Sequence, residues 1–156
     1  MKRLIPLIAL LAVLAVLGAC GSTKPPTTAA TQGSKVIATL RDLSTLYGKK
    51  NLPGFMNLIA PAYQGRKEFS ATLESVFSKY ETVQFTVQYS RMDIFIDAKG
   101  TTKVTFNWDS SWETKGGSIQ KNSGRGTFQF EPKNGTLVAI DGKSPFLPQA
   151  IEAPKQ

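Results

Sequence analysis

The hydrophobic period of this chain changes once, from helix-like to strand-like, near Thr82. Before that position apolar residues recur at spacings of three and four, and after it they alternate with polar residues. No internal repeat is visible in either part. Helices that all precede the strands predict an α+β domain.

Three helices are predicted before the change in period. The first ends at Gly48, and the second spans about 52–60 with Asn51 as its N-cap. Pro53 suits the first turn of the second helix, and Pro61 lies beyond its end. The apolar faces of the first and third helices are formed by Val36, Leu40, Leu43 and Tyr47, and by Phe69, Leu73, Val76, Phe77 and Tyr80.

The first strand is expected to change its buried face partway along. Apolar residues of one phase end at Tyr89, and those from Met92 onward take the opposite phase. Because a slip of one residue exchanges the two faces of a strand, a β-bulge or sharp bend is expected near Ser90 and Arg91. Such a bend would also curl the sheet.

Three more strands are expected after the bend. The second strand should point its apolar residues inward and its polar residues, such as Asn107 and Asp109, outward. A polar loop follows, and a two-residue turn of Asn134 and Gly135 joins the last two strands. The expected inward residues are Val104, Phe106, Trp108, Phe128 and Phe130, the loop is 115–123, and the last two strands are 126–131 and 136–140.

The first 20 residues predict export from the cytoplasm. Lys2 and Arg3 precede an uncharged apolar run of 16 residues. This order is typical of a secretory signal peptide, and the run is shorter than the ~20 residues that a spanning helix needs. The sequence that ends it resembles the lipobox of bacterial lipoproteins, and its residues are Leu17, Gly18, Ala19 and Cys20. The resemblance implies cleavage before Cys20 and lipidation of its thiol.

A lipid on Cys20 would anchor the protein in a membrane of the cell envelope, facing the periplasm or the exterior. Two or three acyl chains make a stable anchor, whereas one holds poorly. Gly21 follows the cysteine, and an Asp there would have indicated retention in the inner membrane of enteric-type bacteria. The outer membrane is therefore the expected location in a cell that has one.

The rest of the chain is expected to form a tether, one domain and a tail. Residues 21–34 are rich in Thr and Pro and cannot bury a core, so a flexible tether is predicted there. The domain is expected at 35–147, and 148–156 is expected to be disordered. Removal of Lys2 and Arg3 would lower the net charge from +8 to +6.

The order of helices and strands resembles the nuclear transport factor 2-like superfamily from about Lys35 to Phe146. The resemblance implies three helices packed on a strongly curved, mostly antiparallel sheet of four to six strands, which together form a cone. It also implies either a small enzyme, such as an isomerase, dehydratase or cyclase, or a non-catalytic binding or dimerising module. The residues that carry it are Leu46, Tyr47, Asn51, Leu52, Phe55, Met56, Val104, Phe106, Trp108, Trp112, Gly126, Phe128, Phe130, Gly135, Leu137 and Ile140.

Few residues could supply catalysis, because the sequence has no histidine and its one cysteine is Cys20. The candidates for an acid or base are Asp93, next to the expected bulge, and Glu113, next to Trp112. Asp97 and Asp109 are expected to be solvated. No carboxylate spacing indicates a metal site, and no cofactor is predicted.

The aromatic residues suggest two kinds of partner. Tyr47, Trp108 and Trp112 would line an apolar cavity for a small hydrophobic ligand if the cone were only partly filled. Alternatively, Trp112 could contribute to a homodimer contact. The basic residues are dispersed, without a dense run or an aromatic motif, which argues against nucleic acid. They favour attraction to anionic headgroups or cell-wall polymers.

Two hypotheses follow. The favoured one is a membrane-anchored module that binds or assembles without catalysis, and the alternative is a small cone-type lyase or isomerase that acts on a hydrophobic molecule. A cone filled by Phe106, Trp108 and Phe128 would argue for the first. An empty pocket with Asp93 or Glu113 beside a tyrosine would argue for the second.

Overall fold

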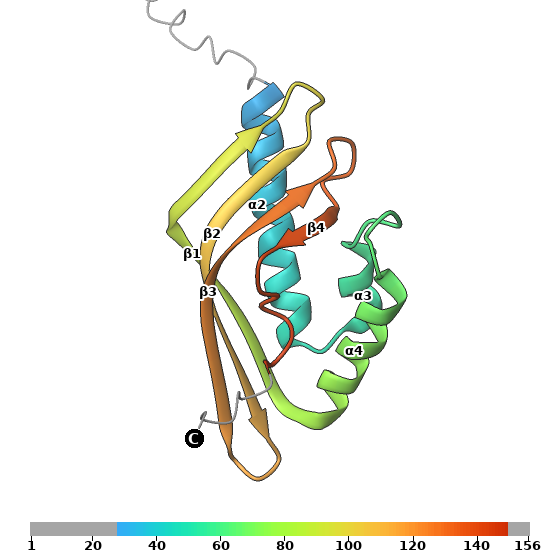
Figure 1. The fold of residues 1–156 in the computed structure, drawn as a ribbon, viewed down its shortest axis with the longest axis vertical. Helices are drawn as coiled ribbons and strands as arrows, with labels where there is room; N and C mark the ends of the chain where they lie inside the picture. Colours follow the sequence, from blue (N-terminus) through green and yellow to red (C-terminus); the bar gives the residue numbers. More distant parts are fainter. Residues whose placement is uncertain (1–27, 150–156) are drawn as a thin grey trace, which may run out of the picture.

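The computed structural model describes residues 28–149, so the predicted signal peptide and Cys20 lie outside the described residues. Within residues 28–149, three helices precede four strands, as predicted, and the strands form one antiparallel sheet in the order β1-β2-β3-β4 (Figure 1). Between residues 28 and 149, no helix is long and apolar enough to cross a membrane. The elements are α2 (Thr28–Gly48), α3 (Leu52–Asn57), α4 (Arg66–Lys79), β1 (Tyr80–Ile96), β2 (Thr102–Thr114), β3 (Ile119–Phe130) and β4 (Leu137–Asp141).

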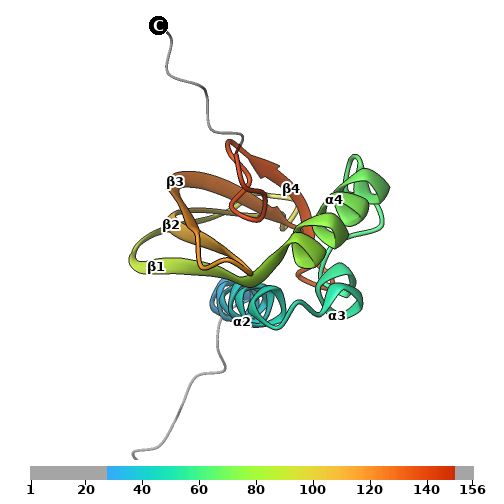
Figure 2. The same ribbon diagram turned by 90° about the horizontal axis from the view of Figure 1, so that it is seen from below.

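The sheet is strongly curled, which confirms the predicted cone. In Figure 2, β1 and β3 lie on opposite sides of an interior, α2 lies beside β1, and α3 and α4 lie across the open side. The curl coincides with the expected bulge in β1. Between the pairs Gln88–Asn107 and Asp93–Thr105, β1 has four residues where β2 has only Phe106. The surplus residues bend β1 and redirect the far half of the sheet.

Helix α2 begins seven residues before the predicted start of the domain at Lys35, so 28–34 are helical and not part of a flexible tether. Tertiary contacts explain this difference. The Nζ of Lys35 donates a hydrogen bond to the carbonyl oxygen of Lys133 (2.6 Å), in the turn between β3 and β4. Gln32 lies against Gly100 in the turn between β1 and β2. Both turns therefore support the start of the helix.

The second helix begins as predicted and ends three residues early. The Asn51 side chain accepts a hydrogen bond from the Gly54 amide (3.0 Å), which confirms the cap. The residues after Asn57 leave the helix because they pair with β4. The Leu137 amide donates to the Leu58 carbonyl (2.8 Å), and the Leu137 carbonyl accepts from the Ala60 amide (2.9 Å).

The predicted polar loop at 115–123 is wrong. β3 already starts at Ile119, and its first half pairs with β2 over the whole stretch from Glu113–Ile119 to Trp108–Gly124. Here the backbone ladder holds the strand, although most of its side chains are polar and none of its residues is buried. A turn does lie at Asn134–Gly135, with φ +68° at the glycine. It is longer than the predicted two residues, because the Glu131 amide pairs with the Thr136 carbonyl (3.0 Å) across residues 132–135.

Candidate functional site

The interior of the cone is filled by a residue from the C-terminal end of the described chain. After β4 the chain turns at Gly142 (φ +95°) and runs back through the interior. We call residues 142–149 the C-terminal strap. Phe146 of this strap has no exposed surface. Its ring lies against rings from α2, α3, α4, β1 and β3, which belong to Tyr47, Phe55, Phe69, Phe85 and Phe128, at centroid distances from 4.8 to 6.3 Å.

A buried chain of hydrogen bonds fixes the strap. The indole Nε1 of Trp112 donates to the Tyr47 hydroxyl (2.6 Å), and that hydroxyl donates to the carbonyl oxygen of Phe146 (2.8 Å). Burial raises the pKa of Tyr47 well above its usual range, and the hydrogen bond from Trp112 opposes this shift only in part. Tyr47 is therefore neutral and structural at neutral pH.

The three predicted ligand-lining residues lie in this interior, but none has any exposed surface. Tyr47 and Trp112 contact each other, and Trp108 lies on the same face of β2 as Trp112. Phe146 occupies the space that an open cavity beside Tyr47 would need. Trp112 also offers no surface to a second copy of the chain. The only sequence signal for a filled interior was the apolar pair Phe146–Leu147 in an otherwise polar segment.

Glycines in β3 make room for the second tryptophan. A Cβ at Gly124 would lie 2.8 Å from Cζ2 of Trp108, and one at Gly126 would lie 3.4 Å from its Nε1. The indole thus packs directly against the β3 backbone. Its Nε1 is buried without a hydrogen-bond partner, as are Oγ of Ser110 and Nδ2 of Asn122 nearby on the same face. These three atoms are buried polar groups without a hydrogen-bond partner in a mostly apolar interior.

Neither of the two candidate carboxylates lies in the cone. The Asp93 side chain is 77% exposed and forms an ion pair with Arg125 across the outer face of the sheet (2.7 Å). Glu113 follows Trp112 on β2, and because successive strand residues point to opposite faces, it lies on the outer side. Asp109 is also on the outer face, where it accepts a hydrogen bond from Gln88 (2.7 Å).

The described residues provide no evident place for a metal ion. Between residues 28 and 149, no group of three or more His, Cys, Asp or Glu side chains lies close enough together to hold one. Carboxylates on the outer face are instead used in pairs with amide or guanidinium groups, as at Asp109 and Asp93.

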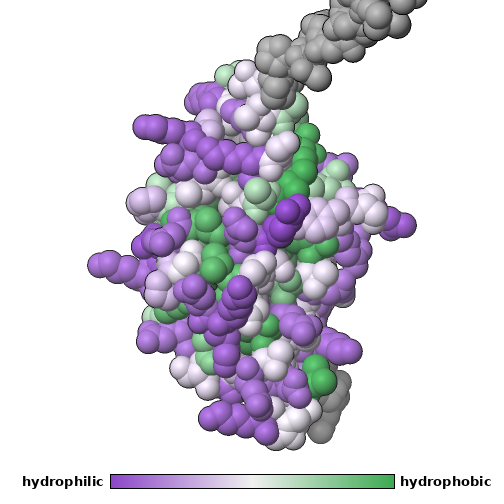
Figure 3. Space-filling model, turned by 180° about the vertical axis from the view of Figure 1, so that it is seen from behind, coloured by the Kyte–Doolittle hydropathy of each residue, from purple (hydrophilic) through white to green (hydrophobic). Residues whose placement is uncertain are grey.

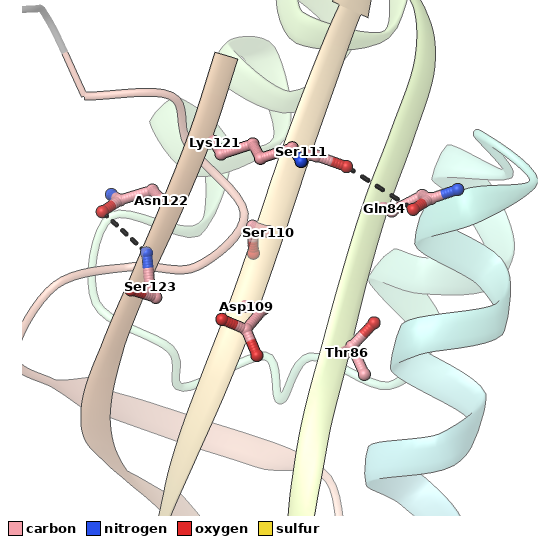
Figure 4. Close-up of a pocket in the computed structure, with 8 residues that line it drawn as sticks. All are labelled: Gln84, Thr86, Asp109, Ser110, Ser111, Lys121, Asn122 and Ser123. Carbon is pink, nitrogen blue, oxygen red and sulfur yellow. Dashed lines mark hydrogen bonds between the residues drawn. The ribbon is translucent and has the colours of Figure 1, made fainter. Parts of the chain in front are cut away.

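The outer face of the sheet is polar and is not covered by any described helix (Figure 2). Hydrogen bonds cross it between neighbouring strands, for example between the hydroxyls of Thr105 and Thr127 (2.8 Å). A shallow, open depression of about 580 Å³ lies at β1, β2 and β3 (Figure 4). The side chains that point into it are amide, hydroxyl, carboxylate and ammonium groups, from Gln84, Thr86, Asp109, Ser111, Lys121 and Ser123. Ser110 and Asn122 also border it, but their side-chain polar atoms are buried on the inner face.

Several solved structures share this architecture at low sequence identity. A nuclear transport factor 2-like superfamily protein from Salmonella enterica has a TM-score of 0.59 at 12% identity, over 79% of this chain and 97% of that one. PrhC from Penicillium brasilianum has a TM-score of 0.57 at 16% identity, over 70% and 79%. RV0760c from Mycobacterium tuberculosis, in complex with estradiol-17β-hemisuccinate, has a TM-score of 0.52 at 11% identity, over 68% and 90%.

No protein-family model and no curated protein matches the sequence. The likeness therefore lies in the order of the helices and strands and in the curl of the sheet, which the solved structures share. On this ground the chain has the nuclear transport factor 2-like fold.

Proposed function

We propose that this chain is a membrane-anchored extracytoplasmic lipoprotein whose domain binds a partner and does not catalyse a reaction. One observation carries the second part of this proposal. Phe146 fills the cone, so the interior has no open space beside a candidate acid or base. The two candidate carboxylates, Asp93 and Glu113, lie on the outer side of the sheet.

The surface that suits a partner is the outer face of the sheet. Its depression offers donors and acceptors within a short span, and Asp109 and Lys121 leave it without a dominant charge. Such a lining complements a polar, hydroxyl-rich partner better than an apolar one. A cell-wall polymer has this chemistry and lies in the compartment that the signal peptide implies.

The anchor in this proposal is a lipid on Cys20. The support is the order of charged, apolar and small residues that ends at this cysteine. Localisation to the cell envelope, and to the outer membrane where one exists, follows from the same residues. The net positive charge would favour an anionic surface.

A second candidate is the binding of a small hydrophobic ligand inside the cone. It is favoured by the solved complex of the similar RV0760c with estradiol-17β-hemisuccinate. In this chain such a ligand would have to displace Phe146 and break the hydrogen bond from the Tyr47 hydroxyl to the strap. A lyase or isomerase would need, in addition, a carboxylate in the interior.

The anchor is tested by intact-mass spectrometry of the protein extracted from its own membrane. The proposal expects a mature chain that starts at Cys20 and carries two or three acyl chains. The Cys20→Ala variant should lose both the acyl mass and the membrane fraction. A variant that stays in the membrane fraction would contradict the proposed anchor.

The binding face is tested by a photo-crosslinking side chain placed at Ser111, in the depression, and at Ser75, on the exposed side of α4, as a matched control. Both proteins are exposed to light in intact cells. The proposal expects a product that contains cell-wall material from the Ser111 position only. Equal products from both positions, or none from Ser111, would contradict a partner on this face.

A further inference from the structure

Three segments meet at the end of the molecule where the described chain begins (Figure 1). They are the first turns of α2, the turn between β1 and β2, and the turn between β3 and β4. A Cβ at Gly100 would lie 3.3 Å from Nε2 of Gln32 and 3.2 Å from Cβ of Pro132. Lys35 and Lys133 are joined by a hydrogen bond (2.6 Å). We call this region the N-terminal end.

The N-terminal end carries an exposed aromatic side chain. Phe95 is 63% exposed, the largest value among the large hydrophobic residues of the described chain that are exposed. It lies beside Lys103 across the strands, and its neighbour Ile94 is 40% exposed. Seen from behind, the surface is mostly hydrophilic, and one of its hydrophobic areas lies toward the N-terminal end (Figure 3). A single exposed apolar residue is ordinary, so its meaning depends on its surroundings.

The surroundings of Phe95 are basic. Two carboxylates lie among the lysines and are used within their turns. Asp97 accepts the amides of Lys99 and Thr101 (2.9 Å each), and Glu131 accepts hydrogen bonds from Asn134 and Thr136. A third, Asp93, lies two residues before Phe95 on the same face of β1 and is paired with Arg125. Four exposed lysines outnumber them, namely Lys35, Lys99, Lys103 and Lys133. The region therefore combines a net positive charge with an aromatic side chain.

The chain length outside the described part decides which end of the domain lies near the membrane. Thr28 is eight residues after Cys20, and eight residues span at most about 29 Å when fully extended. The opposite end of the sheet is farther away, because the 13 residues of β2 rise about 43 Å at ~3.3 Å each. A lipid on Cys20 would thus hold the N-terminal end closest to the bilayer.

We propose that the N-terminal end docks on the surface of an anionic bilayer, with Phe95 in the interface and the lysines on lipid phosphates. This inference rests on the proposed lipid anchor. Aromatic side chains suit the boundary between headgroups and acyl chains, and lysines gain from a negative surface potential. The lysine stems can also lie along apolar surface while their ammonium groups reach the phosphates.

The test places a tryptophan at Phe95 or, as a control, at Ile119. Ile119 is also exposed and apolar (57%), but it lies at the far end of β3. The natural Trp108 and Trp112 have no exposed surface, so their emission is a constant background that the unsubstituted protein measures. The full lipidated proteins are reconstituted into vesicles of phosphatidylglycerol and brominated phosphatidylcholine, because bromine in the acyl chains quenches only tryptophans that reach them.

We expect loss of emission and a blue shift for Phe95→Trp, and neither for Ile119→Trp. Equal quenching at both positions, or none at either, would overturn the inference. A blue shift at position 95 without quenching would also overturn it, because it would indicate that protein covers this surface. Intact mass and flotation with the vesicles are measured in parallel. Lipidated, floating protein with unquenched Trp refutes the docking but leaves the anchor standing, whereas protein without acyl mass refutes both.

The contribution of the lysines to docking is tested separately, in the Phe95→Trp protein. Replacing Lys99 and Lys103 by Gln should lower the quenching, and so should a rise in salt, because exposed charges are screened. The matched control replaces Lys49 and Lys67, which are also exposed but lie on other parts of the molecule. If both pairs change the quenching to the same extent, the lysines at the N-terminal end have no specific role.

Discussion

The two faces of β2 and β3 differ in polarity and in burial. On the inner face, Phe106, Trp108 and Phe128 have no exposed surface, whereas the outer face of the same strands is polar and open. Neighbouring residues of a strand therefore lie in different surroundings, one buried and the next at the surface, because side chains alternate between the two faces. The inner face, closed by the C-terminal strap, supplies stability. The outer face is not covered by a described helix (Figure 2), so its side chains are accessible to a partner.

The largest loss of stability is expected when the interior is emptied. Phe146→Ala removes a ring that contacts five others, and we expect a loss of about 3–5 kcal/mol in the free energy of unfolding. Urea unfolding measures it, with the exposed Phe95→Ala as the control. A loss below 1 kcal/mol would mean that the strap is not part of the core. Indole added to the Phe146→Ala protein should restore part of its thermal stability if the vacated space can take an aromatic ligand.

The next test adds volume where the inner face has none. Gly124→Ala places a Cβ 2.8 Å from the ring of the fully buried Trp108. We expect a destabilisation of about 1–3 kcal/mol, because the indole cannot move without repacking. Gly116→Ala is the matched control, since the nearest atom to its Cβ is Oγ1 of Thr114 at 3.9 Å. Equal thermal midpoints for the two variants would refute close packing at Gly124.

Removing one buried hydroxyl tests the fastening of the strap. Tyr47→Phe keeps the ring but leaves the Trp112 Nε1–H and the Phe146 carbonyl unpaired. We expect a loss of about 1–3 kcal/mol in the free energy of unfolding. Tyr63→Phe serves as the control, because Tyr63 is only partly buried. Denaturant unfolding that ranks the two variants equally would contradict the role of the hydrogen-bond chain.

The same hydroxyl should make stability depend on alkaline pH. The pKa of Tyr47 is raised by burial, so unfolded protein releases this proton near pH 10 while folded protein keeps it. The contribution is complete below pH 10 and is lost as pH rises above it, by up to about 1.4 kcal/mol per pH unit. Unfolding free energies from pH 9 to 11 should fall less steeply for Tyr47→Phe than for the natural chain. Parallel curves would show that Tyr47 does not carry the dependence.

The smallest effect is expected on the outer face. Arg125→Ala removes the ion pair with Asp93, in which both side chains are more than half exposed. Such pairs contribute about 0–1 kcal/mol, so the thermal midpoint should hardly move. A change as large as that of Tyr47→Phe would mean that the outer face is also part of the stabilising structure. It would then be a weaker candidate for a binding surface.

Much of the fold could be predicted from local patterns. The alternation of Val104, Phe106 and Trp108 predicted which face of β2 is buried, and the phase change near Ser90 predicted the bend. The error at 115–123 has a physical reason. A strand whose side chains are polar on both faces has no hydrophobic alternation, and only its backbone pairing with β2 makes it a strand.

The candidate site was less predictable. Tyr47, Trp108 and Trp112 were correctly placed in the interior, but whether the interior was open depended on a residue far away in the sequence. Phe146 lies 99 positions after Tyr47, the residue to which its carbonyl is bonded. No local period marks such a contact, because the strap is neither helix nor strand.

Local sequence patterns were enough to predict the order of helices and strands, the inward residues and the bend in β1. These features depend on neighbours three, four or two positions apart, or on adjacent residues. Three features became visible only in the tertiary structure. The cone is filled, and Asp93 pairs with Arg125 outside it. Phe95 lies at the same end of the molecule as lysines from three segments. Those outcomes require distant segments to pack together, and packing depends on shape in three dimensions.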